Sequence, residues 1–509
     1  MSANGRGPSA AVPMQVLMRL AAAFAVGGSL NLAFAPFGWW PLGILAPAAL
    51  FALIRGLPPR RAGWTGGAFG GGLFAFGTYW LYTCLHVFGL VPIWLTLILQ
   101  GALIALMALY TAALCFLANR FWLKPGATRA WLVLPVLWVL LEWLRGWLLT
   151  GFPWLSLGYA MIDSPLAGWA PVFGIYGVTW AAAMIAAALN TLALPAAPRS
   201  RRLAAAGGIV LLMALPMLIG RHPWTRSAGP AVMVAAVQGA VSQDQKWQAK
   251  NLPETMARYS RLNEQAWGAK LIVWPESALP VLAGQIADYL QRLALAGRAH
   301  NAEFAIGLVM YQPQTNQFRN GILVMNESGE SWYYKRHLVP FGEYFPVPDF
   351  VRSWMRLISL PYSDFAPGDA RQPTLSAAGQ KLALTVCYED AFGSEQRRAV
   401  REATLLINVT NNAWFGDSTA PHQHFQIARM RALESGRYLV RAANDGITAV
   451  VGPQGDIVAR LPQFQEAVLR AEVKPMTGVT PYVRFGNYPV VIGAGVLLML
   501  AIWRRRQGV

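Results

Sequence analysis

Long apolar runs separated by short loops fill the first 220 residues, and this pattern constrains the fold more than any other feature. Only Glu142 and Asp163 are acidic in this part, whereas the remaining 22 of the 24 acidic residues lie later. A membrane-spanning helix needs about 20 mostly apolar residues. The pattern therefore predicts a polytopic α-helical membrane bundle of about eight spans. The predicted spans lie near residues 20–35, 39–54, 65–84, 91–118, 131–149, 169–193, 203–220 and 487–503.

Basic loops alternate with loops that contain no Lys or Arg, and this asymmetry predicts the topology. The loops near residues 36–38, 85–90 and 150–168 carry no Lys or Arg. The basic residues of the opposite loops and of the tail are Arg6, Arg19, Arg55, Arg60, Arg61, Arg120, Lys124, Arg129, Arg199, Arg201, Arg202, Arg504, Arg505 and Arg506. Because cytoplasmic loops carry an excess of Lys and Arg, we expect both termini in the cytoplasm. The segment 221–486 is then periplasmic in a Gram-negative cell, and the chain is a multi-pass protein of the inner membrane.

The change in composition predicts three parts. These are a seven-span transmembrane domain at 1–220, a water-exposed domain at 221–486, and an eighth span with a basic cytoplasmic tail at 487–509. The net charge of +18 could suggest nucleic acid as a partner. The basic residues nevertheless occur in short groups between apolar runs, which is typical of membrane topology. We therefore expect the lipid bilayer as a partner and no nucleic acid.

Short, β-branched apolar runs alternate with helical stretches from about Ala231 onwards. The predicted strands are AVMVAAVQG, AKLIVWPES, EFAIGLVMY, NGILVMN, KLALTVCYED, TLLINVT, ITAVVG and EAVLRAEV. Helices are predicted for NLPETMARYSRLNEQAWG and ADYLQRLALAGRAH. Strands that alternate with helices are typical of an α/β domain.

Three polar side chains stand where predicted strands end, which is where α/β domains usually place their chemistry. Glu276 closes LIVWPES, Lys335 ends SWYYK, and Cys387 ends LALTVC. A thiolate can attack a carbonyl carbon, a carboxylate can take and return the proton, and an ammonium can stabilise the oxyanion. The alternatives are a solvated glutamate, a lysine that snorkels beside aromatic residues, and a core thiol. Cys84 and Cys115 lie in apolar runs, where we expect them to act as small hydrophobic residues.

The motifs around these residues resemble the nitrilase superfamily of carbon–nitrogen hydrolases in their order and spacing. They are WPES with Glu276, YYKRHLVPFGEY with Lys335 and Glu343, and CYED with Cys387. Over nearly the whole chain, GFPWLSLGY, APVFGIYGVTW, KRHLVPFGEYFP and NVTNNAWFGDS resemble blocks of the apolipoprotein N-acyltransferase family.

The resemblance implies a nitrilase-like αββα sandwich and a function for each site residue. In it Glu276 is the general base, Lys335 stabilises the oxyanion, and Cys387 is the nucleophile. Glu343 orients the lysine and assists proton transfer. Tyr388 and Glu389 shape the pocket beside the thiol.

The resemblance also implies the substrates. A phospholipid donates an acyl chain to the cysteine, and the resulting thioester transfers it to the α-amine of S-diacylglyceryl-cysteine at the N-terminus of a diacylated apolipoprotein. The reaction is ping-pong and completes lipoprotein maturation. No cofactor or metal is implied.

Two other functions compete with this interpretation. A membrane-tethered nitrilase-type amidase would hydrolyse small amides and would need water at the thioester. A transporter with a ligand-binding outer domain would need polar, discontinuous helices near the midplane. Within the predicted spans only Glu142 and Arg145 offer such polarity, and they are also explained as a pair that neutralises itself near the outer interface.

Further residues are candidates for lipid contact or for a metal. Trp247 matches an aromatic residue on a mobile loop of the family, and Trp354 belongs to a predicted amphipathic arm. The apolar residues of that arm are Phe350, Trp354, Met355, Leu357 and Ile358. His422 and His424 in PHQHFQ could suggest a metal site, but no thiolate or carboxylate set completes one, so a structural function is expected.

Overall fold

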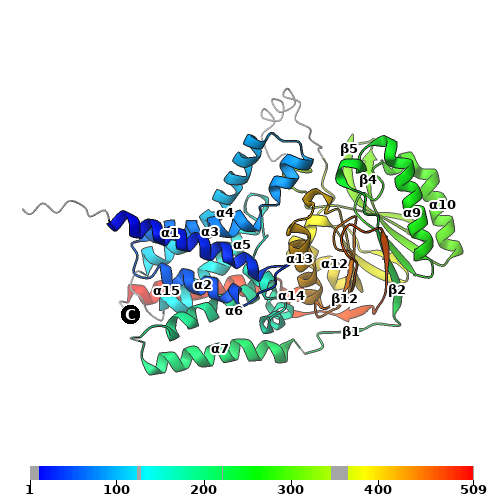
Figure 1. The fold of residues 1–509 in the computed structure, drawn as a ribbon. Coiled ribbons are helices and arrows are strands. Elements are labelled where there is room, and N and C mark those ends of the chain that lie inside the picture. The colour runs from blue at the N-terminus through cyan, green and yellow to red at the C-terminus, as the bar shows by residue number, and fades with distance from the viewer. Residues whose placement is uncertain (1–10, 123–127, 196, 221, 345–364, 508–509) are drawn as a thin grey trace, which may run out of the picture. The chain divides into compact units, whose positions relative to one another are not determined.

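The computed structural model describes residues 11–122, 128–195, 197–220, 222–344 and 365–507. The chain forms two compact units. The first comprises Met1–Arg221 together with Asn487–Val509, and the second is His222–Gly486. The first unit is helical, and the second contains the strands (Figure 1).

Eight α-helices are described in the first unit, and several are long and apolar enough to cross a membrane. They are α1 (Ala11–Ser29), α2 (Leu42–Leu53), α3 (Pro59–Gly77), α4 (Ile93–Phe121), α5 (Leu134–Arg145), α6 (Ala170–Leu192), α7 (Arg199–Ile219) and α15 (Tyr488–Arg506). Among the described residues, five helical segments meet the length and hydropathy of a span, namely Met14–Ala33, Ile93–Phe121, Pro165–Leu192, Arg199–Ile219 and Tyr488–Arg506. The chain is therefore a membrane protein, whereas the count of eight spans stays a prediction.

The helices outside those five are short or rich in glycine. Helices α2 and α5 have 12 residues each. Helix α3 has 19 residues, but Arg60, Arg61 and its many glycines make it less apolar. The glycines of α3 have a packing function instead, because small residues let helix backbones approach closely.

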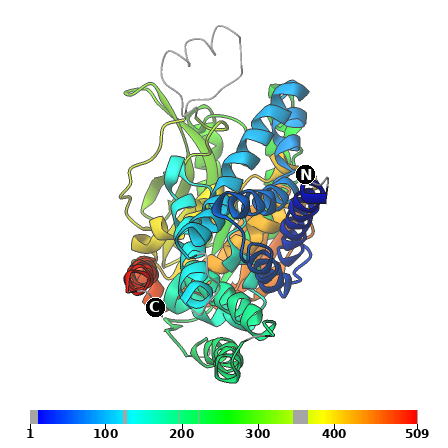
Figure 2. The same cartoon turned by 90° about the vertical axis from the view of Figure 1, so that its left-hand side faces the viewer.

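Helix α3 packs against α4 on one face and α1 on another (Figure 1 and Figure 2). A Cβ atom at Gly66 would overlap the carbonyl oxygen of Thr111 in α4. A Cβ atom at Gly72 would overlap the carbonyl oxygen of Phe24 in α1. The two neighbouring helices can reach α3 this closely only because these positions carry no side chain.

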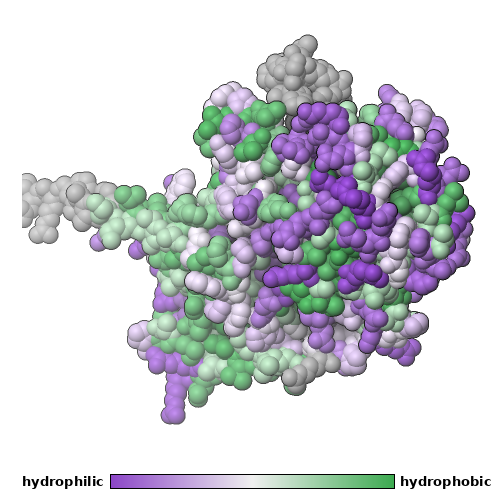
Figure 3. Space-filling view, turned by 45° about the vertical axis from the view of Figure 1, so that its right-hand side comes forward, coloured by the Kyte–Doolittle hydropathy of each residue, from purple (hydrophilic) through white to green (hydrophobic). Residues whose placement is uncertain are grey.

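Apolar side chains cover much of the surface of the first unit, which fits a lipid environment. Figure 3 shows apolar residues over much of its visible surface. Large exposed examples are Leu97 and Leu109 in α4, Leu211 in α7, and Met499 in α15.

Glu142 and Arg145 are buried, and together they fasten the loop that follows α5. Their closest charged atoms are 3.9 Å apart, so the direct pair is loose. Glu142 accepts hydrogen bonds from the Trp138 indole, the Leu157 amide and the Thr179 hydroxyl. Arg145 donates to the carbonyl oxygens of Phe152 and Trp154 and to the Ser156 hydroxyl. Both charges therefore hold the segment 152–157, which explains them without a transport pathway.

In residues 222–344 and 365–486, the second unit contains two six-stranded sheets and a small sheet of β1 (Thr225–Ser227) with β14 (Met476–Gly478). The first large sheet has the order β13 (Ala467–Val473), β2 (Val232–Gln238), β3 (Leu271–Trp274), β4 (Glu303–Gln312), β5 (Gln317–Asn326) and β6 (Gly329–Tyr334). The second has the order β12 (Ile457–Arg460), β11 (Ala449–Val451), β10 (Leu439–Ala443), β9 (Leu405–Thr410), β8 (Gln380–Val386) and β7 (Leu375–Ala377). The eight predicted strands and both predicted helices are confirmed.

Side chains alternate between two apolar cores along these strands, as the pleat of a strand requires. In β2, Val234 and Ala236 belong to a core that also contains Leu384 and Ile407 of the second sheet. Ala235 and Val237 point the other way, into a core shared with α9 (Leu252–Ala266) and α10 (Ala287–Ala299). A third core joins the second sheet to α12 (Gly393–Glu402) and α13 (Ala420–Ser435).

The strand directions bring several chain segments to one edge of these sheets. Strands β2, β3 and β4 are parallel, and β8, β9 and β10 are parallel. Strand β6 has the same direction as β4 because two antiparallel pairings separate them. The residues that follow β3, β6 and β8 therefore emerge at the carboxyl ends of their strands, where α/β sheets bind ligands.

Candidate active site

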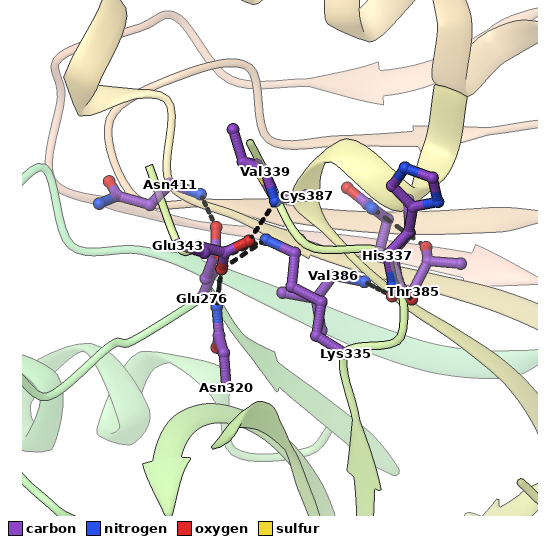
Figure 4. Close-up of polar contacts among 12 residues, drawn as sticks. Glu276, Asn320, Lys335, His337, Val339, Glu343, Thr385, Val386, Cys387 and Asn411 are labelled. Atoms are coloured by element: carbon purple, nitrogen blue, oxygen red, sulfur yellow. Dashed lines mark hydrogen bonds and ion pairs between the residues drawn. The ribbon is translucent and has the colours of Figure 1, made fainter. Parts of the chain in front are cut away.

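Glu276 and Lys335 meet at this edge although 59 residues separate them in the sequence (Figure 4). Glu276 follows β3, and Lys335 follows β6 directly. The Lys335 Nζ atom lies 3.3 Å from Glu276 Oε1, and both side chains are buried. Cys387 follows β8, close enough for the charges of both residues to change the pKa of its thiol. The structure thus brings the three predicted residues together.

Glu343 is the second carboxylate on the lysine. Its Oε1 atom lies 2.9 Å from Lys335 Nζ. The Asn320 amide donates to both carboxylates, at 2.7 Å to Glu276 and 3.1 Å to Glu343. Burial opposes the charge of Lys335, but attraction from the two carboxylates outweighs burial and raises the pKa of Lys335. Lys335 is therefore an ammonium at neutral pH, held between two carboxylates, and it does not give up a proton in this range.

The Glu276 carboxylate is held from two directions. Its Oε1 atom accepts from Lys335 and Asn320, and its Oε2 atom accepts from the backbone amide of Asn411 at 2.8 Å. The Glu276 carbonyl oxygen accepts from the Lys246 Nζ atom at 3.2 Å. These contacts fix the orientation of a group that could accept a proton from a nearby thiol.

Cys387 combines a strained backbone with a protonated thiol. Its φ is 51°, in the left-handed region, at the junction between β8 and the single turn Cys387–Ala391. Non-glycine residues rarely adopt this conformation, and it persists only where the surroundings hold it. Burial and the negative charge of Glu276 raise the pKa of the Cys387 thiol to about 12, although Lys335 opposes the shift. The thiol therefore needs a base before it can attack.

Glu389 joins the lysine segment to the cysteine strand. Its carboxylate accepts from the backbone amides of Val386 and Arg336, at 2.8 Å each, and from the Tyr333 hydroxyl at 3.0 Å. Burial raises the pKa of Glu389, and the Arg336 guanidinium 3.8 Å away opposes that shift. Glu389 therefore braces two segments that carry site residues.

Tyr388 belongs to a small aromatic cluster beside the thiol. Its ring makes an edge contact with Phe392, with centroids 5.0 Å apart, and another with His337 at 5.8 Å. The His337 ring stacks on Phe392 at 3.5 Å. The half-buried Tyr388 ring is thereby held next to Cys387.

Comparison with known proteins decides the family. The model of the apolipoprotein N-acyltransferase N-terminal domain matches residues 26–188, and the carbon-nitrogen hydrolase model matches residues 233–482. An apolipoprotein N-acyltransferase of Vibrio parahaemolyticus is 39% identical over 96% of this chain and 97% of its own. One of Azotobacter vinelandii is 41% identical over 95% of each chain, and one of Pseudomonas putida is 40% identical over 94% of this chain and 95% of its own. The chain belongs to the apolipoprotein N-acyltransferase family.

The remaining candidates from the sequence, two tryptophans for lipid contact and two histidines for a metal, lie in different environments. Trp247 follows the short helix α8 (Gln243–Lys246), and 51% of its surface is exposed. Trp354 and the whole predicted arm lie outside the described residues. His422 contacts the Gln463 amide, and His424 contacts Asn412 and Cys387. Within the described ranges, no three His, Cys, Asp or Glu side chains could hold a metal together.

The sequence did not indicate three residues whose polar atoms contact Glu276 or Glu343: Asn320 and Asn411, which donate to the carboxylates, and Lys246, which donates to the Glu276 carbonyl oxygen. Asn411 follows β9 directly, so the strand-end rule that found Glu276 and Cys387 also applies to it. Asn320 lies inside β5, and Lys246 precedes the exposed Trp247. Nothing in their spacing indicates that their polar atoms reach Glu276 or Glu343.

Proposed function

We propose that this N-acyltransferase moves an acyl chain from a phospholipid to the α-amine of S-diacylglyceryl-cysteine in a diacylated apolipoprotein, through a thioester on Cys387. One observation carries the proposal: Glu276, the Lys335 ammonium and Cys387 meet at one sheet edge, in a chain with several helices able to span a membrane. A base, a cation and a thiol are what acyl transfer through a thioester needs.

The first half-reaction forms the thioester. Glu276 takes the proton from Cys387, and the thiolate attacks the ester carbonyl carbon of the phospholipid. The Lys335 ammonium stabilises the negative charge on the carbonyl oxygen of the tetrahedral intermediate. The carbon–oxygen ester bond then breaks, Glu276 returns the proton to the leaving oxygen, and a lysophospholipid departs.

The second half-reaction consumes the thioester. The neutral amine of the apolipoprotein attacks the thioester carbonyl carbon, and Glu276 accepts a proton from the nitrogen. The carbon–sulfur bond breaks, Cys387 recovers a proton, and the amide product forms. Glu343 supports both steps by holding Lys335, and its 2.9 Å contact with the ammonium supports that role.

The proposal includes the location and the finer fold of each part. Residues 1–220 and 487–509 form eight spans with both termini in the cytoplasm, and residues 221–486 form a periplasmic catalytic αββα sandwich on the inner membrane. Its support is the alternation of basic loops with loops that contain no Lys or Arg, and the three apolar cores of the strand-containing unit. Two membrane-anchored substrates explain why a hydrolase-like domain is joined to spanning helices. Tyr388 and Glu389 shape the pocket, and Trp247 and Trp354 contact lipid.

A mass measurement tests this function. Purified protein incubated with phospholipid should gain the mass of one acyl chain, and Cys387→Ala should gain none while remaining inserted in the membrane. Addition of a diacylated lipopeptide should discharge the adduct to an N-acylated peptide. An adduct that forms equally on Cys387→Ala would refute the mechanism. Release of free fatty acid without N-acylation would favour the amidase.

A further inference from the structure

The main-chain carbonyl of Cys387 is held by a buried imidazole to which the proposed reaction assigns no function. His424 lies in α13 and is fully buried. Its Nε2 atom lies 3.1 Å from the Cys387 carbonyl oxygen. Its Nδ1 atom lies 3.2 Å from the Nδ2 atom of Asn412. Both ring nitrogens therefore have polar neighbours, and those neighbours determine where the proton lies.

The hydrogen-bond partners select one tautomer of His424. Arg441 Nη2 lies 3.4 Å from Asn412 Oδ1, and because a guanidinium can only donate, the amide oxygen faces the arginine. The Asn412 NH₂ group then faces His424 and also can only donate, so Nδ1 must be the acceptor. The ring proton is consequently on Nε2, which donates to the Cys387 carbonyl oxygen.

The imidazole is neutral as well as fixed in its tautomer. Burial and the nearby cations, Arg441 of β10 and Lys335 after β6, lower the pKa of His424 well below its usual value, and the hydrogen bond to Cys387 only partly opposes them. A second proton on Nδ1 would also meet the donor face of Asn412. His424 therefore stays a single-proton donor throughout the ordinary pH range.

Arg441 is anchored to the same motif that contains the cysteine. It is fully buried and donates to Asp390 at 3.0 Å and to Asn408. Asp390 in turn accepts from the Thr385 hydroxyl at 3.0 Å. Thr385 precedes Cys387 by two residues and Asp390 follows it by three, so the network starts and ends beside the cysteine.

We propose that His424, as the Nε2–H tautomer set by Arg441 through Asn412, is a positioning residue that holds Cys387 in its left-handed conformation for attack. A donor on the Cys387 carbonyl fixes the peptide plane that follows the cysteine. Strand β8 fixes the peptide plane that precedes the cysteine, so fixing the following plane as well holds the φ of 51°, the conformation in which the thiol lies within reach of the charges of Glu276 and Lys335. The proposal rests on Cys387 being the nucleophile of the proposed function.

The test compares two variants of the full chain with the wild type in lipid nanodiscs. His424→Gln keeps an N–H donor near the position of Nε2, whereas His424→Leu removes the donor at similar volume. The rate of thioacyl-enzyme formation from phospholipid is measured by mass in a single turnover. We expect His424→Leu to be about 100-fold slower, as for a misplacement of about 1 Å, and His424→Gln to remain within about tenfold of wild type. Equal rates for wild type and His424→Leu, or equal slowing by Leu and Gln, would overturn the proposal.

Asn412→Asp gives a readout that a merely structural function would not change. The new carboxylate can only accept, so it places a proton on Nδ1, and Nε2 then donates only when the ring is doubly protonated. Thioester formation in this variant should fall as pH rises through the imidazole pKa, whereas in wild type it should not. A wild-type pH profile in Asn412→Asp would contradict the tautomer assignment.

A second measurement separates this proposal from the proposed function. Alkylation of Cys387 by iodoacetamide, followed on its own peptide, needs no lipid substrate. We expect His424→Leu to slow alkylation several-fold, because a displaced thiol loses the stabilising charge of Lys335, and His424→Gln to restore it. If wild type forms no acyl adduct, the proposed function fails, while the alkylation rates still test His424. Unchanged alkylation in His424→Leu would refute its positioning function.

Discussion

Two segments place a buried lysine against Glu276, and the environments of the two amines differ. Lys335, after β6, contacts the carboxylates of Glu276 and Glu343 at 3.3 Å and 2.9 Å, and its pKa is raised. Lys246, at the end of α8, contacts the neutral carbonyl oxygen of Glu276 at 3.2 Å. Burial lowers the pKa of Lys246 to about 8, although Glu276 and Asp445 attract its charge.

The contrast shows that burial alone does not determine the charge of an active-site amine. Both side chains are nearly or fully buried, so the difference comes from the partners. Two carboxylates in direct contact stabilise an ammonium more than burial destabilises it. A main-chain carbonyl does not. Lys335 is therefore suited to stabilise an oxyanion, whereas Lys246 is suited to anchor the segment that carries Trp247.

Removal of the Lys335 charge should give the largest effect. Lys335→Met keeps a similar length and removes the ammonium, so the oxyanion loses its donor and the thiol loses the charge that lowers its pKa. Loss of one oxyanion donor costs about 100- to 1,000-fold in rate. We expect a loss of at least that size in thioester formation, measured by mass in a single turnover. Lys246→Met is the matched control, and equal losses in the two variants would abolish the distinction between the lysines.

Removal of one carboxylate should give a smaller effect. Glu343→Gln preserves shape but removes one of the charges that raise the pKa of Lys335. The ammonium should remain at neutral pH, with a loss of about 10- to 100-fold because a charge-assisted hydrogen bond is weakened. At alkaline pH the variant should lose activity earlier than wild type, since its lysine deprotonates at a lower pH. The pH–rate profile checks this, and an unshifted alkaline limb would show that Glu343 does not control the lysine.

Lys246→Met should have the smallest effect on rate and a distinct effect on stability. In the unfolded chain the amine has its ordinary pKa of 10.5, and in the folded chain about 8. Below pH 8 the fold carries the full cost of a buried charge. Between pH 8 and 10.5 the folded state binds fewer protons than the unfolded state, so this cost falls as pH rises.

The apparent Tm measures that difference. Lys246→Met should exceed wild type by a few degrees at pH 7, because about 1 kcal/mol shifts the Tm of a unit of this size by about 2–4 °C. The excess should vanish near pH 10.5. A Tm difference that is independent of pH would mean that the folded amine is not neutralised by burial.

The sequence predicted those elements whose apolar residues face a core. All eight apolar runs from AVMVAAVQG to EAVLRAEV are strands, since their side chains fill the cores on both faces of the sheets. Strand β10 was not predicted because Arg441 interrupts LVRAA. That arginine is fully buried and is compensated by Asp390, a residue 51 positions away. Such compensation depends on the tertiary structure and has no local signal.

The candidate site divides in the same way. Glu276, Lys335 and Cys387 could be predicted because each follows a strand, and the chemistry of three such groups is specific. The hydrogen bond from His424 to the Cys387 carbonyl oxygen connects residues that are 37 positions apart, so it has no local signal. The same holds for the Asn320 amide, which lies within β5 and donates to two carboxylates. Hydropathy alone is likewise ambiguous for α3. Its glycines lower the hydropathy of the helix, and the same glycines allow α1 and α4 to pack closely against it.

The ion-paired cluster around Lys335 has a consequence for the proton inventory of the site. Two carboxylates and one ammonium leave one net negative charge while the thiol is protonated. Transfer of that proton from Cys387 to Glu276 moves the negative charge onto sulfur and leaves the total unchanged. The cluster can thus deprotonate and reprotonate its thiol without taking up or releasing an ion. An enzyme that works against a lipid surface needs no water channel to the thiol for this step.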